Sequence, residues 1–146
     1  MYLTGHGSKK TKEGTTSMTL IEFLDHDDIE NVCSSLTLCP DKVILLSSNK
    51  TLREKCAARY QRFFTARNRE IEFVTESINR NDMQALLKKL SSIVENNENC
   101  VFDVTGGDDL CLVAIGILLE RYKDRSIQLH RINVTNGSIF DIAQNQ

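Results

Sequence analysis

Two short polar stretches of the chain carry residue types that can bind a small anion. The first, TGGD at residues 105–108, lies between a compact apolar run at 100–104 and a long apolar run of helical length. Two consecutive glycines between a strand and a helix let the backbone come close to a ligand and leave the first helical amides pointing outward. The glycines could equally serve only to make the turn compact, and one short motif does not decide.

The second stretch is SSNKT, residues 47–51, which follows the continuous apolar run at 43–46. Hydroxyl and amide side chains at this point either cap the next helix or hydrogen-bond a ligand lying over the carboxyl end of the strand. Both interpretations stay open from this stretch alone. Lys50 and Arg53 are the basic residues near enough to it to contact a phosphate.

Composition limits the classes of protein to which the chain can belong. Its 146 residues predict one domain, and a hydrophobic content of 40% with 26% charged residues is typical of a globular protein. The net charge of −2 argues against a general nucleic-acid-binding surface. The longest apolar run, 110–119, is too short to span a bilayer and no signal peptide is evident, so we expect a cytoplasmic protein without membrane contact. Five cysteines without a CxxC pair indicate reduced thiols rather than a zinc site or disulfides.

Strand-like and helical patterns alternate along the chain. We expect strands at 19–24, 43–46, 71–75, 100–104, 126–134 and 138–142, and helices at 29–36, 52–67, 82–96 and 108–122. The pattern predicts an α/β fold, a Rossmann-like three-layer sandwich with a mostly parallel sheet. Asn136-Gly137 between the last two strands predicts a C-terminal β-hairpin, in which His130 is part of the alternation rather than a catalyst. We expect residues 1–17 to form a flexible N-terminal extension and residues 18–146 to form the Rossmann-like domain.

The strand order decides whether the two polar stretches form one site. If the strands before them are neighbours across a topological switch point, the two loops converge on one pocket at the carboxyl edge of the sheet.

The helix predicted at 108–122 is apolar around nearly its whole circumference. We expect one face with Leu110, Val113, Ala114, Ile117 and Leu118, and a second face with Leu112, Ile115 and Leu119. A surface helix of a monomer needs only one apolar stripe, so the second face predicts a symmetric homodimer. The alternative is a helix covered by other elements of the same chain.

Residues 18–142 resemble a CARF (CRISPR-associated Rossmann fold) domain, in particular the N-terminal sensor domain of CARF-nuclease proteins. The matching motifs are TLIEFLDHDDIENV, VILLSSNK, FDVTGGDDLCLVAIG and RINVTNGSIFDI. The resemblance implies a homodimeric sensor of a type III CRISPR ancillary system that binds cyclic oligoadenylate, with cyclic tetra-adenylate as the favoured ring, and regulates an effector nuclease. The effector half is not among these residues, so we expect a stand-alone sensor or an excised regulatory domain.

The resemblance also implies which residues contact the ligand. With Lys50 and Asp108 added, the predicted ligand-binding residues are Ser47, Ser48, Asn49, Lys50, Thr105, Gly106, Gly107 and Asp108. We predict no catalytic residue, no metal, no cofactor and no direct binding of long nucleic acid.

Two other functions compete with the sensor. In a metal-independent ring nuclease, Ser47, Ser48, Lys50 and Thr105 would orient a ribose 2′-hydroxyl for in-line attack on its phosphate. In a dimerisation scaffold with a vestigial pocket, nothing would bind. Asp108-Asp109 keeps the scaffold open, because these carboxylates would compete with phosphate for the helix amides. In a sensor, the phosphates would instead lie nearer Ser47 to Lys50, with Asp108 contacting a ribose hydroxyl or an adenine amine.

Overall fold

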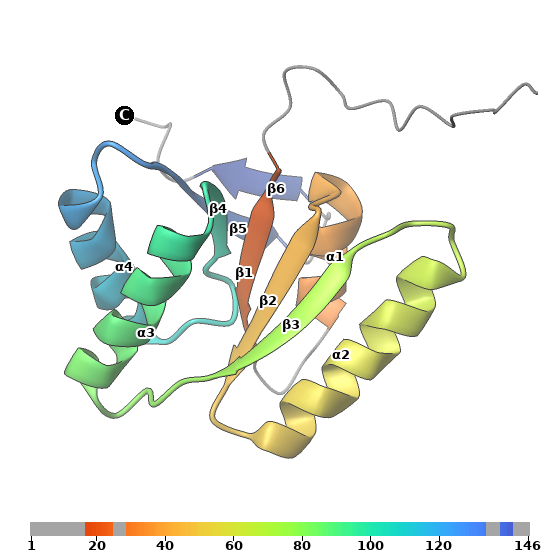
Figure 1. Ribbon diagram of the computed structural model, residues 1–146, viewed down its shortest axis with the longest axis horizontal. Coiled ribbons are helices and arrows are strands. Elements are labelled where there is room, and N and C mark those ends of the chain that lie inside the picture. Colours follow the sequence, from red (N-terminus) through yellow and green to blue (C-terminus); the bar gives the residue numbers. More distant parts are fainter. Residues whose placement is uncertain (1–16, 25–28, 134–137, 142–146) are drawn as a thin grey trace, which may run out of the picture.

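The computed structural model describes residues 17–24, 29–133 and 138–141, which form a six-stranded sheet between two layers of helices (Figure 1). The elements in chain order are β1 (Thr19–Phe23), α1 (Ile29–Leu38), β2 (Lys42–Ser47), α2 (Lys50–Thr65), β3 (Glu72–Ser77), α3 (Met83–Asn96), β4 (Asn99–Asp103), α4 (Asp109–Arg121), β5 (Ser126–Asn133) and β6 (Ser138–Asp141). The predicted α/β, Rossmann-like architecture is confirmed.

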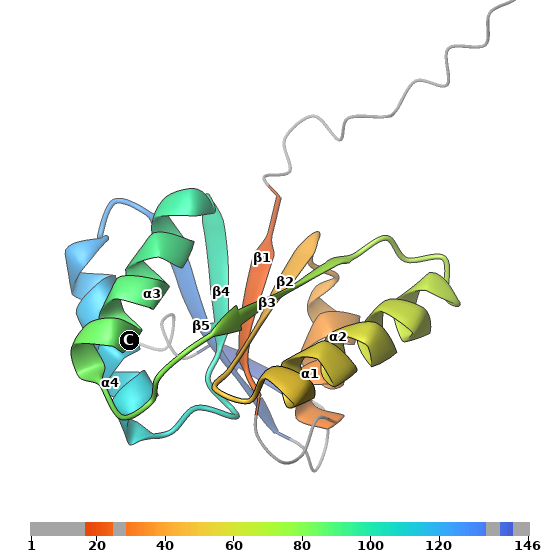
Figure 2. The same cartoon turned by 60° about the horizontal axis from the view of Figure 1, so that its bottom comes forward.

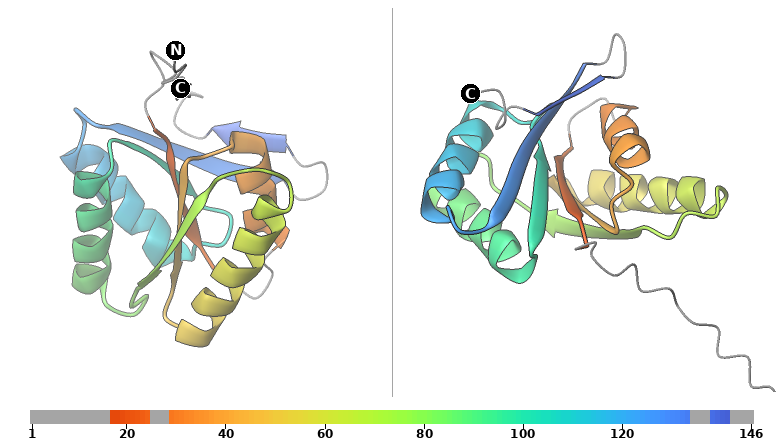
Figure 3. Two further views of the ribbon diagram at one scale, coloured as in Figure 1. Left: turned by 45° about the vertical axis from the view of Figure 1, so that its right-hand side comes forward. Right: turned by 90° about the horizontal axis from the view of Figure 1, so that it is seen from above.

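Each face of the sheet is covered by its own pair of helices, α1 and α2 on one face and α3 and α4 on the other (Figure 3). The strands are apolar on both sides, as β1 illustrates. Ile21 and Phe23 pack toward α3 and α4, whereas Leu20 and Leu24 pack toward α2. This double burial explains why the strands read as continuous apolar runs, and it makes the sheet a fixed platform for the loops at its edges.

The strand order is β3-β2-β1-β4-β5-β6. The chain builds outward from β1 through β2 to β3, then returns to place β4 on the other side of β1, so the topological switch point lies between β1 and β4. The strands that precede the two polar stretches, β2 and β4, are therefore not neighbours, because β1 lies between them. Their loops still leave the same edge of the sheet.

The end of the chain adds two strands to this sheet. β5 is parallel to β4, and β6 pairs antiparallel with β5, from His130 opposite Asp141 to Asn133 opposite Ser138. The predicted turn at 135–137 lies outside the described residues, as do residues 1–16 of the predicted extension. Within the described ranges, no helix is long and apolar enough to cross a membrane.

The faces predicted for α4 are wrong. The buried residues are Cys111, Ala114, Ile115 and Leu118, while Leu112 and Val113 are 45% and 55% exposed. The buried stripe therefore combines residues of both predicted faces with a cysteine. What remains outward is a smaller apolar strip around Leu112 and Val113.

Candidate functional site

Three loops meet at the carboxyl edge of the sheet, which Figure 2 turns toward the reader. The loop from β3 to α3 connects them, because the chain must pass below the ends of β2 and β1 on its way back to β4. The Ile78 amide donates to the Ser47 carbonyl at the end of β2, at 3.4 Å. Two residues later, Arg80 reaches the end of β1 and the turn after β4. The edge is thus one connected surface.

Arg80 is the central cation of this edge. Its Nη2 donates to the Leu24 carbonyl at 3.1 Å and its Nη1 to the Gly106 carbonyl at 3.4 Å. The guanidinium also lies 5.8 Å from the centre of the Phe23 ring. The guanidinium is half-buried and its two hydrogen-bond acceptors are neutral carbonyls, and a phosphate is a stronger acceptor than a carbonyl. Arg80 can therefore bind an anion at this edge.

The turn after β4 borders a hollow of about 260 Å³. It is built around Asp103, whose Oδ1 accepts hydrogen bonds from the Thr105 amide at 3.0 Å and the Thr105 hydroxyl at 2.5 Å. The Gly107 amide donates to the Val104 carbonyl at 3.1 Å, which closes the turn. The hollow is lined by Val104, Thr105, Gly107, Leu112 and Arg131. It combines small backbone-exposing residues with one exposed cation.

Asp108 caps the helix that follows. Its Oδ1 accepts from the Cys111 amide at 3.0 Å, so the carboxylate occupies the helix N-terminus that an anion would otherwise use. Slight burial raises the pKa of Asp108, but hydrogen bonds from Cys111 and the nearby Arg80 guanidinium outweigh it and hold the pKa below its ordinary value of 3.8. Asp108 is therefore charged at neutral pH, and an incoming phosphate would be repelled from these amides.

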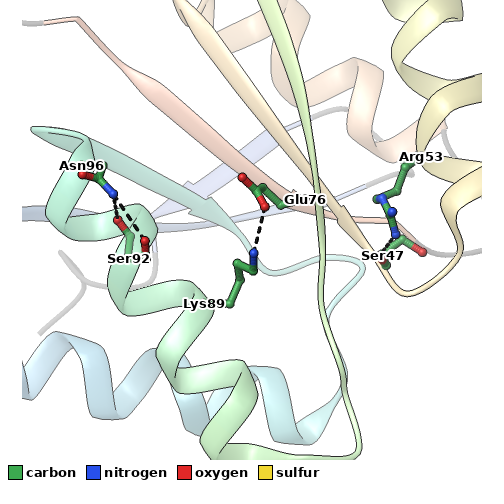
Figure 4. A network of polar contacts seen from close by, with 6 residues as sticks. All are labelled: Ser47, Arg53, Glu76, Lys89, Ser92 and Asn96. Carbon is green, nitrogen blue, oxygen red and sulfur yellow. Dashed lines mark hydrogen bonds and ion pairs between the residues drawn. The ribbon is translucent and has the colours of Figure 1, made fainter.

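The stretch after β2 serves mainly to cap α2. The Ser47 hydroxyl is buried and accepts from the Asn49 amide at 3.1 Å, and the Asn49 side chain accepts from the Leu52 amide at 3.1 Å. Arg53, a predicted phosphate contact, donates from Nη1 to the Ser47 carbonyl at 2.6 Å (Figure 4). These bonds support the capping interpretation for Ser47 and Asn49.

Two other residues of this stretch are more accessible. Ser48 is exposed, and Lys50 is exposed and forms a weak ion pair with Glu54 at 3.8 Å. Neither lines the hollow beside the turn after β4. The structure thus brings Thr105 and Gly107 to one hollow, and leaves Ser48 and Lys50 two strands away on the same edge.

A larger hollow, of about 620 Å³, lies at the opposite edge of the sheet. Its lining includes three carboxylates, Asp41, Glu70 and Glu72, while Arg69 is held by the Leu36 carbonyl at 3.1 Å. The excess of negative charge makes this hollow a poor site for a phosphate-bearing ligand. In the part of the chain that the structure describes, no three His, Cys, Asp or Glu residues are grouped to hold a metal ion.

No protein-family model and no curated protein matches the sequence. The fold, in contrast, is similar to that of several solved structures. One is Can2 from Sulfobacillus thermosulfidooxidans in complex with cyclic tetra-adenylate, with a TM-score of 0.70 at 18% identity over 88% of this chain. Another is protein VC1899 from Vibrio cholerae, with a TM-score of 0.64 at 12% identity over 87% of this chain.

A third similar structure is a type III CRISPR defence DNA nuclease activated by cyclic oligoadenylate, with a TM-score of 0.51 at 14% identity over 82% of this chain. The chain has the fold of a CARF domain. The three matches cover only 36%, 33% and 19% of those proteins, respectively. The CARF-like domain therefore corresponds to about a third or less of each of them.

Sequence reasoning missed two cations of this CARF-like domain, Arg80 and Arg131. Arg80 lies three residues beyond the carboxyl end of β3, the same kind of position as the two polar stretches, and this placement was a usable signal. Arg131 lies within the alternating polar and apolar residues of β5, so nothing in its immediate sequence marks it as a site residue.

Proposed function

We propose that this chain is a sensor domain that binds cyclic oligoadenylate and contributes no catalytic residue. The observation that carries the proposal is the hollow beside Thr105 and Gly107, at the turn after β4, with Arg131 in its wall and Arg80 on the other side of the turn. Open α/β sheets bind ligands outside the carboxyl ends of their strands at the switch point, and β4 is one of the two strands that form this point. The fold shared with Can2, solved in complex with cyclic tetra-adenylate, supports this ring as the first ligand to test.

The charged residues at the carboxyl edge determine where we expect the phosphates of the ligand to bind. Because the Asp108 carboxylate already caps α4, the phosphates do not lie on the first amides of that helix. Arg80 and Arg131 offer the positive charge instead, one on each side of the turn. A flexible ring with several phosphates can contact both. This division explains how the turn keeps two acidic residues at the start of α4 and still binds an anion.

A homodimer would complete the site. Leu112 lines the hollow and is 45% exposed, and its neighbour Val113 is 55% exposed, so a second copy packed on this strip would lie beside the hollow. A hydrogen bond to a charged group contributes about 1.5–3 kcal/mol. Two or three per chain barely reach the roughly 8 kcal/mol of micromolar binding even before ordering costs are subtracted, whereas twice that number, from two chains acting on one symmetric ring, can reach it. Binding would then hold the two copies in one arrangement, which is how such a domain could regulate an effector nuclease.

The proposal is tested by melting the purified chain with cyclic tri-, tetra- and hexa-adenylate and then chromatographing the nucleotide. A higher melting temperature with at least one ring, recovered intact, supports the sensor. Linear products would mean that the chain is a ring nuclease and not a sensor. An unchanged melting temperature with every ring would mean that the chain is a dimerisation scaffold.

A further inference from the structure

The charged residues of the chain are unevenly distributed along it. Residues 50–70 hold seven basic and two acidic side chains, and the rest of the chain holds eleven basic and eighteen acidic ones. The net charge of −2 is therefore an average over a strongly basic segment and an acidic remainder. Most of the basic segment is α2, which lies at one side of the molecule beside the edge strand β3 (Figure 1).

Three of these cations form a stripe on the outer face of α2. Lys55, Arg59 and Arg62 follow one another at intervals of four and three residues, so they lie on one face of the helix, and all three are exposed. Within the described part of the chain, the side chains of Lys55 and Arg62 form no hydrogen bond or ion pair. A solvated helix face usually mixes both signs of charge, whereas the acidic residue of α2, Glu54, lies off this stripe and pairs with Lys50.

Arg67 adds a flat surface for stacking near the end of α2. Its guanidinium lies 3.5 Å from the centre of the half-buried Phe63 ring, and its Nη1 donates to the Phe63 carbonyl at 3.1 Å. Because Arg67 is exposed, one face of the guanidinium covers the ring and the other faces solvent. Unpaired nucleic-acid bases stack on such planes, whereas the carboxylate side chains of an acidic protein have no ring to place there.

We propose that the outer face of α2 binds single-stranded nucleic acid, with phosphates along the stripe and an unpaired base on Arg67. From Lys55 to Arg62 the helix rises about 10 Å, a length over which a stacked strand with about 3.4 Å per nucleotide places three phosphates. A duplex fits less well, because its paired bases cannot reach the guanidinium plane.

This surface is separate from the proposed sensor site. The hollow beside the turn after β4 has no lining residue from α2, so the inference does not rest on the proposed function. It departs from the expectation, drawn from the net charge, that the chain binds no long nucleic acid. A local basic surface can bind a polyanion even when the chain as a whole is acidic.

The test is fluorescence anisotropy with a labelled single-stranded DNA of mixed sequence, about 12 nucleotides long. About three phosphate contacts predict a slope of about −2 when the logarithm of the association constant is plotted against that of the salt concentration. Lys55→Gln and Arg62→Gln should each weaken binding about eightfold at about 50 mM salt and make the slope shallower by about 0.7. Glutamine has a helix propensity close to that of lysine and arginine, so the melting temperature should stay near that of the wild type.

Two further variants separate stacking and total charge from the stripe itself. Arg67→Lys keeps the positive charge but loses the plane, so it should bind the mixed-sequence strand more weakly at an unchanged salt slope. An abasic strand of the same length should bind equally to the wild type and to Arg67→Lys. Lys88→Gln removes an exposed cation of α3, on the other face of the sheet, and should bind like the wild type.

The outcomes that overturn the inference are distinct from those that overturn the sensor. No binding by the wild type at about 50 mM salt, equal losses in Lys55→Gln and Lys88→Gln, or wild-type affinity in Arg67→Lys would each overturn it. Polyglutamate that displaces the strand as well as unlabelled DNA does would identify an acidic protein as the partner and overturn it too. Lys55→Gln should bind cyclic tetra-adenylate like the wild type, and a wild-type chain that binds the strand but no ring would end the proposed function alone.

Discussion

Replacing Arg80 with glutamine should abolish ligand binding while leaving the fold intact. The guanidinium makes two hydrogen bonds to carbonyls, at 3.1 and 3.4 Å, and one ring contact at 5.8 Å. If it moves to a phosphate when ligand binds, each charged hydrogen bond lost removes about 1.5–3 kcal/mol of binding. That is a factor of about 10–150 in Kd for one chain, and a ring held by two chains loses the contribution twice.

Arg125 provides a matched control for the structural part of this effect. It also donates to two backbone carbonyls, those of Val94 at 3.1 Å and Glu95 at 3.4 Å, and lies 5.9 Å from the centre of the Tyr122 ring. Arg125→Gln removes a similar set of contacts away from the proposed site. Both variants should therefore lower the melting temperature by similar amounts, because they lose similar contacts.

Calorimetric titration with cyclic tetra-adenylate separates the two variants. Arg125→Gln should keep wild-type affinity, and Arg80→Gln should show no measurable binding. Arg80→Lys should bind with intermediate affinity, because it keeps the positive charge but loses the planar guanidinium that can donate two hydrogen bonds to one phosphate. Wild-type affinity in Arg80→Gln, or an equal loss in both glutamine variants, would refute the assignment of Arg80 to a phosphate.

Gly106→Leu should remove the ligand-induced rise in melting temperature, because it places a bulky side chain in the turn between Thr105 and Gly107, which both line the hollow. An unchanged rise would mean that the pocket is elsewhere. Val113→Glu, at a position 55% exposed and outside the hollow, should convert a dimer to monomers in sedimentation at little change in stability, and a wild-type monomer would contradict the role given to α4. Burial raises the pKa of the Cys111 thiol from 9.0 to about 11, which lowers its thiolate fraction about a hundredfold. A thiol-alkylating reagent followed by mass-spectrometric mapping should therefore label exposed Cys39 much faster than Cys111, and equal labelling would contradict the burial of Cys111.

The elements and their order could be predicted because periodicity and turn residues are local signals. The boundaries differ by one or two residues where a cap decides them, as at Asn49, which starts α2 two residues before the predicted position. The faces of α4 could not be predicted in the same way. An apolar residue at nearly every position leaves no polar stripe to mark the outside, so packing on the sheet decides that Ile115 is buried and Val113 exposed.

The candidate site was predicted in part for a similar reason. The turn at Thr105 and Gly107 is visible in the sequence because two consecutive glycines between an apolar run and a helical pattern are a local signal. Arg80 becomes part of the site only because β3 lies at the edge of the sheet and the chain must return past β1 to β4. That route depends on the strand order, which no local pattern specifies. Asp103 likewise appears as one more residue of a strand until Thr105 and Ser34 are seen to share it.

Titration of the ¹⁵N-labelled chain with cyclic tetra-adenylate, followed by amide chemical shifts, reports directly where the ligand binds. We expect the largest shifts at Thr105, Gly106 and Gly107, with the Arg80 side-chain signal moving in step. No shifts, or shifts confined to the acidic hollow around Glu70 and Glu72 at the opposite edge, would contradict it.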